Sequence, residues 1–179
     1  MSNATVGTTP EAVPMRQLVD WRAALIAGFI AGSVFLLFVV FVVPVIFGNG
    51  DISTALRNIG SVILGPTALQ EQESLSLIAI LAALVVNYAL AILATLLLAI
   101  IIHRWGLVTG IVLGAIFGFA LYLINNFLTS QFFPWFIFNT TWFVTAHIIF
   151  GAIAGGAYEA FEVEKFVPIE PVVDLVEEN

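Results

Sequence analysis

Long apolar runs with no charged residue in their interior dominate the pattern of the chain. A helix that crosses a bilayer needs about 20 apolar residues, and four runs reach that length: residues 23–47, 75–102, 107–128 and 142–161. Because lipid offers the backbone no hydrogen-bond partner, each run is expected to be helical. The pattern therefore predicts an all-α membrane protein with a four-helix transmembrane bundle over residues 23–161. Pro44 is expected to kink or fray the last turn of the first helix.

The three connections between these runs differ in length and character. In the first, residues 51–64 separate apolar from polar side chains, which predicts a short amphipathic helix at the membrane interface or against the bundle. Asp51 or Ser53 would cap this helix, and its polar face would hold Asp51, Arg57, Asn58 and Ser61. The second connection, residues 103–106, is a tight turn that predicts antiparallel neighbours. The third, residues 129–141, is rich in Phe and Trp, which is typical of the membrane–water interface.

The basic residues predict how the bundle is oriented. One side of the predicted membrane carries Arg16, Arg22, Arg104 and Lys165, whereas the other side carries Arg57 alone. An excess of basic residues marks the cytoplasmic side. Both the N-terminal tail, residues 1–22, and the C-terminal tail, residues 162–179, are therefore expected in the cytoplasm, with the bundle in a bacterial cytoplasmic (inner) membrane.

The C-terminal tail mixes acidic side chains with β-branched apolar ones, and Pro168 and Pro171 prevent a regular helix in its middle. One interpretation is a disordered acidic tail. Disordered segments are usually poor in β-branched residues, so we favour the other interpretation, an extended arm that docks on a partner.

Composition narrows the possible functions. Hydrophobic residues make up 61% of the chain and charged residues 9%, a surface too apolar for an ordinary soluble domain. The net charge of -7 and the lack of a basic patch exclude a nucleic-acid partner. Cysteine is absent from the sequence, which excludes disulfides and thiolate sites. The motifs G-x-S-x-G and H-E-x-x-H and a phosphate-binding loop are also absent, so we expect no catalytic residue, no cofactor and no metal site.

Glycine recurs at a spacing of four in three of the predicted helices. This spacing places the glycines on one helix face, where two backbones can approach closely. The predicted helix-packing residues are Gly28, Gly32, Gly110, Gly114, Gly118, Gly151 and Gly155. The pattern leaves open whether these glycines pack inside the chain or against other membrane subunits.

The same positions suggest an internal repeat of two helices each. Gly28 and Gly32 match Gly110 and Gly114. Asn87, Ala91 and Thr95 in the second run match His147, Gly151 and Gly155 in the fourth. A duplication and a chance similarity between apolar helices are both compatible with this pattern.

Three polar side chains lie inside the predicted bundle: Asn87, Asn125 and His147. Asn125 and His147 should lie near the outer surface, close enough to hydrogen-bond, whereas Asn87 should be deeper. An intramembrane histidine can act as a proton relay, a haem ligand or a metal ligand. The other histidine, His103, lies at the cytoplasmic end, so the two cannot share one iron. We therefore expect His147 to be structural.

The fourth run carries the pattern His147-xxx-Gly151-xxx-Gly155-xx-Tyr158. In this pattern it resembles uncharacterised bacterial four-helix inner-membrane proteins of the YagU type. The resemblance covers residues 23–161 in architecture and the last helix in motif, while Asn87 stands where that family usually has a histidine-like position. It implies a four-helix architecture and no particular activity.

Taken together, these features predict a protein that is not an enzyme. We expect a non-catalytic accessory subunit of a larger membrane complex, of the kind found in respiratory or photosynthetic electron transfer. Its expected partners are the lipid bilayer and other integral membrane subunits. It would contact these subunits through three surfaces: the faces formed by the helix-packing glycines (the glycine stripes), the aromatic third connection, residues 129–141 (the aromatic outer loop), and the C-terminal tail. The alternatives are a small transporter or permease working as an oligomer, with Asn87, Asn125 and His147 along its path, or an envelope-stress membrane protein.

Overall fold

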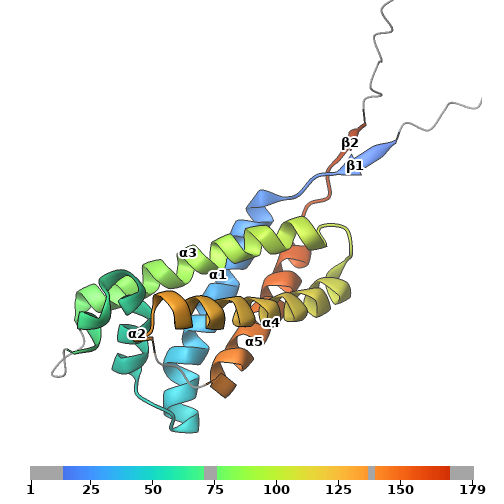
Figure 1. The fold of residues 1–179 in the computed structure, drawn as a ribbon. Helices are drawn as coiled ribbons and strands as arrows, with labels where there is room; N and C mark the ends of the chain where they lie inside the picture. Colours follow the sequence, from blue (N-terminus) through green and yellow to red (C-terminus); the bar gives the residue numbers. More distant parts are fainter. Residues whose placement is uncertain (1–13, 71–75, 137–139, 170–179) are drawn as a thin grey trace, which may run out of the picture.

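Figure 1 shows the protein in a computed structural model, which describes residues 14–70, 76–136 and 140–169. Four helices are long and apolar enough to cross a membrane: Trp21–Ile46, Leu77–Ile102 (α3), Leu107–Phe132 (α4) and Thr140–Phe161 (α5). The prediction of four long apolar helices is thus confirmed. Their ends differ from the predicted ones by a few residues, most at the end of α4, which continues to Phe132 instead of ending at residue 128.

The first long helix changes its winding along its length. Its N-terminal part, α1 (Trp21–Leu37), is α-helical and is capped by Asp20, whose Oδ1 accepts hydrogen bonds from the backbone N–H groups of Arg22 and Ala23. Its last part, η1 (Phe38–Ile46), is a π-helix that contains Pro44. Proline lacks the N–H group that an α-helical turn requires. The expected disturbance at Pro44 therefore takes the form of a wider winding over nine residues.

The helices pack in the order α3, α1, α5, α4. In the view of Figure 1, α3 and α4 run across the front, and α1 and α5 cross behind them. The tight turn after α3, at Gly106 with a φ of +77°, reverses the chain as expected. However, α3 and α4 touch at few points, because the glycine face of α4 lies against α5. The two helices are joined by a tight turn as predicted, but the main packing partner of α4 is α5 rather than α3.

Small residues fill the centre of the bundle. The main core contains eight buried alanines together with larger side chains from α3 and α5: Ala23, Ala24, Ala27, Ala31, Ala91, Ala94, Leu98, Ala99, Ile102, Phe150, Ala154 and Tyr158. Large apolar side chains instead cover the outside of α3 and α4. Small residues inside allow the helix backbones to approach closely, and the distribution is the inverse of that expected for a soluble bundle.

The first connection contains the predicted short helix, α2 (Ile52–Leu64), which packs against α3. A second, smaller core joins the two, with Leu56 and Ile59 of α2 against Ala83 and Val86 of α3. A short 3-10 turn, η2 (Pro66–Leu69), follows.

The predicted polar face of α2 is only partly correct. Arg57 and Ser61, which were assigned to this face, are both buried. The reason is the small Gly60 beside them: a Cβ at Gly60 would lie 2.8 Å from the carbonyl oxygen of Ala79. This side of α2 therefore rests on α3.

The two ends of the described chain form a ribbon beyond the bundle (Figure 1). Strand β1 (Met15–Gln17) pairs antiparallel with β2 (Phe166–Pro168), and the register places Arg16 opposite Val167. Residues 166–168 of the predicted C-terminal arm thus pair with residues 15–17 of the same chain. The acidic remainder of the arm, residues 170–179, lies outside the described residues, as do residues 1–13.

Candidate functional site

Helices α4 and α5 meet through glycines on both sides. A Cβ at Gly114 would overlap the carbonyl oxygen of Gly151, and one at Gly118 would overlap that of His147. In the reverse direction, a Cβ at Gly155 would overlap the carbonyl oxygen of Gly110. The two backbones therefore touch directly along this seam, and any side chain at these positions would separate them.

Helices α1 and α3 meet through glycines on one side only. A Cβ at Gly28 would lie 2.9 Å from the Cα of Ile92 and 3.3 Å from the Cβ of Thr95. At Gly32 it would lie 2.8 Å from the Cβ of Ala91. Here a glycine face meets small side chains, so the contact is close but includes Cβ atoms.

The contacts between α1 and α3 correspond to those between α4 and α5. However, the glycines that correspond are not the ones that the repeat in the sequence matched. Gly28 faces Ala91 and Thr95, just as Gly114 faces Gly151 and Gly155. Gly32 faces Asn87 and Ala91, just as Gly118 faces His147 and Gly151. In contacts, Gly28 and Gly32 thus correspond to Gly114 and Gly118, one helical turn later than the sequence match to Gly110 and Gly114.

Each of the three polar side chains that were predicted inside the bundle joins two helices. Asn87 on α3 donates from Nδ2 to the carbonyl oxygen of Gly32 on α1, at 3.0 Å. Asn125 on α4 and His147 on α5 lie 2.8 Å apart, measured from Nδ2 to Nε2. The structure therefore brings Asn125 and His147 together and places Asn87 at the other seam.

The contacts of His147 define its protonation. Its Nδ1 lies 2.8 Å from the carbonyl oxygen of Phe143, which can only accept, so Nδ1 carries the hydrogen. Its Nε2 then accepts from the amide of Asn125, and the neutral imidazole is fully hydrogen-bonded. The rings of Phe35, Tyr122 and Phe143 surround it at centroid distances of 5.0, 6.1 and 4.4 Å. Neither ring nitrogen is directed at an open ligand position.

The second histidine belongs to a different region. His103 ends α3, where its Nδ1 lies 3.0 Å from the carbonyl oxygen of Ile100 and its Nε2 accepts from Arg104. Within the described part of the chain, no group of three His, Asp or Glu side chains is arranged to hold a metal ion.

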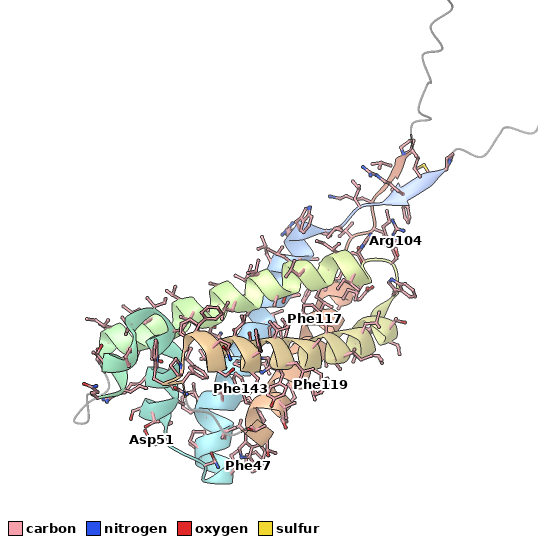
Figure 2. All side chains as sticks on the ribbon, in the orientation of Figure 1. Phe47, Asp51, Arg104, Phe117, Phe119 and Phe143 are labelled. Atoms are coloured by element: carbon pink, nitrogen blue, oxygen red, sulfur yellow. The ribbon has the colours of Figure 1, made fainter. Side chains whose placement is uncertain are left out.

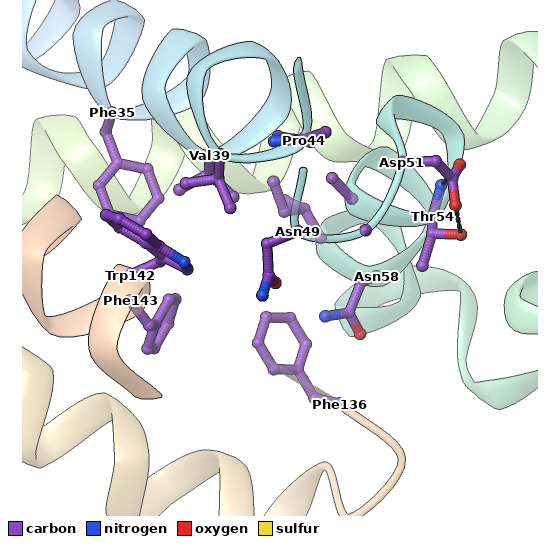
Figure 3. A pocket seen from close by; sticks show the side chains of 14 residues that line it. Phe35, Val39, Pro44, Asn49, Asp51, Thr54, Asn58, Phe136, Trp142 and Phe143 are labelled. Atoms are coloured by element: carbon purple, nitrogen blue, oxygen red, sulfur yellow. Dashed lines mark hydrogen bonds between the residues drawn. The ribbon is translucent and has the colours of Figure 1, made fainter. Parts of the chain in front are cut away.

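A pocket of about 390 Å³ opens at the end of the bundle away from the β-ribbon. Its volume is within the range of small-molecule sites, roughly 300–1,000 Å³. Three separate segments form it: the end of the first long helix, α2 with the residues before it, and the chain around the start of α5. Figure 3 shows the polar side chains Asn49 and Asn58 facing the rings of Phe136, Trp142 and Phe143.

Two aromatic residues that line the pocket also contact His147. Phe35 and Phe143 line the pocket, and both rings contact the His147 imidazole edge to face. Trp142 is held by stacking on Phe47, at a centroid distance of 4.1 Å. These aromatic walls are therefore fixed by contacts outside the pocket.

Asp51 supplies charge at the edge of the pocket. Its carboxylate accepts hydrogen bonds from the hydroxyls of Ser53 and Thr54, both at 2.6 Å, and from the Thr54 backbone N–H at 2.9 Å. The two hydroxyl groups and then the backbone N–H favour the ionised form and lower the pKa of Asp51 to about 2. The group is therefore an anion at neutral pH. Sequence reasoning identified Asp51 as a helix cap but not as part of a pocket.

At the opposite end of the bundle, a network of hydrogen bonds joins the segments before α1 and after α5. We call this network the clasp, and sequence reasoning missed it. Tyr158, fully buried on α5, donates from its hydroxyl to Glu162 at 3.0 Å and accepts from the backbone N–H of Asp20 at 3.2 Å. The carboxylate of Asp20 in turn accepts from the N–H of Val163. This clasp holds the two ends of the chain together. Asp20, just before an apolar run, is a typical N-cap residue and was the available signal.

Comparison with known proteins adds no relative to this picture. No protein-family model, no curated protein and no solved structure matches the chain.

Proposed function

We propose that the protein spans a bacterial cytoplasmic membrane four times, with both termini in the cytoplasm. The apolar outside of α3 and α4 supports insertion, since water would not tolerate so large an apolar surface. The distribution of basic residues supports the orientation. Arg104 lies at the end of the bundle that carries the β-ribbon, together with Arg16, Arg22 and Lys165, and Asp51 lies at the opposite end (Figure 2).

Within that membrane we propose a non-catalytic role as an accessory subunit of a larger complex. The observation that carries this proposal is the β-ribbon, which projects from the bundle with exposed apolar side chains: Met15, Phe166 and Ile169. An isolated two-stranded ribbon is marginal in water, and its free strand edges are suited to pairing with another chain. A partner with an apolar, strand-forming surface at the cytoplasmic face would cover it.

The glycine stripes give this proposal no support, although the sequence suggested that they would. The described glycines of all three stripes face other helices of the same chain. Two surfaces remain for a partner. One is the β-ribbon, and the other is the aromatic end of the bundle around Phe136 and Trp142. We extend the proposal to complexes of respiratory or photosynthetic electron transfer, which the identity of a co-purifying chain would test.

The polar groups support a structural role over a transport path. A transporter would need Asn87, Asn125 and His147 along a route for solute. Asn87 instead binds the backbone of α1, and Asn125 and His147 bind each other. Each of these contacts joins two helices, which is the use expected of polar groups in a packed membrane bundle.

The test is purification from native membranes in mild detergent, followed by sizing and identification of co-migrating chains. We expect a stoichiometric partner that is lost in Phe166→Glu, because a charge on the ribbon opposes burial. The matched control is Ile63→Glu, which changes a similarly exposed apolar residue at the other end of the molecule and should retain the partner. A lone monomer or homo-oligomer that moves a solute in liposomes, with activity lost in Asn87→Leu or His147→Leu, would refute the proposal.

A further inference from the structure

We propose that the pocket at the outer end of the bundle binds an organic cation that carries an apolar group, such as a substituted ammonium. The proposal assigns a ligand class to the space between Asp51, Asn49, Asn58 and the rings of Phe136, Trp142 and Phe143. It stands independently of the ribbon and of the accessory role proposed above.

Charge selects the ligand. Asp51 is the only charged side chain among the described residues that line the pocket. Arg57, the nearest basic residue along the chain, is buried and does not line it. The carboxylate already accepts hydrogen bonds from Ser53 and Thr54. It would therefore attract a ligand through its negative charge, and an anionic ligand would be repelled.

The aromatic walls select the apolar part of the ligand. Trp142 and Phe143 lie across the pocket from Asp51, with Asn49 between them (Figure 3), so their rings would contact the uncharged body of the ligand. Trp142 is fixed by its stacking on Phe47, and Phe143 by its contacts with His147, so the rings need not rearrange to receive a ligand. Rings held in place in this way reduce the entropy lost on binding.

The remaining surface explains why the ligand should be amphipathic. The π-helical end of the first long helix lines the pocket with Val39, Val43 and Pro44, whereas Asn49 and Asn58 supply amides beside them. Departures from α-helical winding often occur at functional sites. A ligand with a charged head near Asp51 and an apolar body against η1 and the rings would match both halves.

Equilibrium dialysis of the full-length protein in a neutral maltoside detergent tests this inference, with benzyltrimethylammonium as the probe. We expect saturable binding of one cation per chain. Benzyl alcohol, which is uncharged, and benzenesulfonate, which is anionic, should bind at least about fivefold more weakly. Equal affinity of benzyl alcohol for the same saturable site would overturn the proposal.

Two variants locate the site. Asp51→Asn keeps a good N-cap residue on α2 and should weaken cation binding roughly fivefold or more, as should Trp142→Leu. The matched control is Asp20→Asn, which changes the helix-capping carboxylate at the other end of the bundle and should leave binding unchanged. Circular dichroism verifies folding, and Asp51→Asn alone suffices if Trp142→Leu does not fold. Unchanged affinity in folded Asp51→Asn would contradict the assignment.

The ammonium group has two possible sources, a lipid headgroup or a free amine. Displacement of the probe by dihexanoyl phosphatidylethanolamine would support a lipid headgroup, whereas displacement by free phenethylamine but not by this lipid would support a free amine. Loss of the partner in Phe166→Glu does not depend on this site, so failure here and failure of the accessory role are distinguishable.

Discussion

The helix pairs α4–α5 and α1–α3 both bring two backbones close together, but they differ in how much side chain lies between the backbones. Helices α4 and α5 present glycine to glycine, so the backbone of one lies directly on the backbone of the other. Helices α1 and α3 present glycine to alanine and threonine, so Cβ atoms take part in the contact. In lipid there is little hydrophobic drive between helices, and close packing is a main source of cohesion. The pair with less side chain between its backbones should therefore be the less tolerant of any added atom.

The largest expected effect is at the glycine–glycine seam. Gly114→Ala would place a methyl group on the carbonyl of Gly151, a backbone atom that cannot move without moving its helix. We expect a loss of about 3 kcal/mol in the free energy of unfolding, at the upper end of overpacking costs. Unfolding in mixed micelles with increasing dodecyl sulfate measures it. An unchanged midpoint would show that the backbones are not in contact.

A smaller effect is expected at the glycine–alanine seam. Gly28→Ala would meet the Cα of Ile92 at 2.9 Å and the Cβ of Thr95 at 3.3 Å, a smaller overlap than the one between the methyl group of Gly114→Ala and the carbonyl of Gly151. We expect a loss of about 1–2 kcal/mol in the same assay. Val108→Ala is the control, because Val108 at the start of α4 is exposed and its truncation should change stability by less than about 0.5 kcal/mol. A Gly28→Ala cost equal to that of Gly114→Ala would remove the distinction between the pairs.

The polar contacts should contribute still less at either seam. His147→Gln keeps an amide that can bond to Asn125, and we expect a loss of about 1 kcal/mol or less. Asn87→Leu should cost a similar amount at the other pair, since it removes the bond to Gly32. Because we interpret His147 as structural, visible absorption should not change. A haem Soret band in the wild type that vanishes in His147→Gln would sink this interpretation.

The smallest expected effect concerns the clasp that Tyr158 and Glu162 form with Asp20, at the end of the bundle that carries the β-ribbon. Burial raises the pKa of Glu162, and this outweighs its hydrogen bond from Tyr158, which lowers it. The folded-state pKa is therefore above the value of the unfolded chain, so the ionised form is disfavoured in the folded protein. Stability of the clasp should rise as pH falls through the raised pKa toward the ordinary value of 4.5 and then level off. Hydrogen exchange of residues 162–169 at pH 5 and pH 8 measures this.

Glu162→Gln provides the control for the clasp, because an amide keeps the partner for Tyr158 but does not titrate. Exchange of the same residues in this variant should not depend on pH beyond the intrinsic chemistry. A wild-type clasp that exchanges faster at pH 5 than at pH 8, after that correction, would contradict the assignment.

The sequence predicted the features that depend on neighbouring residues. Uninterrupted apolar runs located the four long helices, and the spacing of glycine identified helix faces suited to close packing, without showing whether they pack within the chain. Asp51 was recognised as a cap from its position before an apolar pattern. These signals are local, because helix formation in lipid is set by the length and polarity of one segment.

The features that the sequence did not predict depend on distant segments. The ribbon pairs residues 15–17 with residues 166–168, at opposite ends of the described chain. The burial of Arg57 and Ser61 depends on α3, against which α2 rests through Gly60. The pocket combines residues from 35–59 with residues from 136–143. No periodicity within one segment carries that information, and nothing around Pro44 distinguishes a π-helix from a simple kink.

The membrane topology is the claim on which the rest depends, and cysteine labelling tests it most directly. The chain contains no native cysteine, so single substitutions at the exposed residues Gln70, Gln131, Met15 and Val163 give unique sites. A membrane-impermeant maleimide added to intact cells should label Gln70→Cys and Gln131→Cys, at the pocket end. It should label Met15→Cys and Val163→Cys only after the membrane is opened. Labelling of Met15→Cys or Val163→Cys in intact cells would contradict the four-span bundle with cytoplasmic termini.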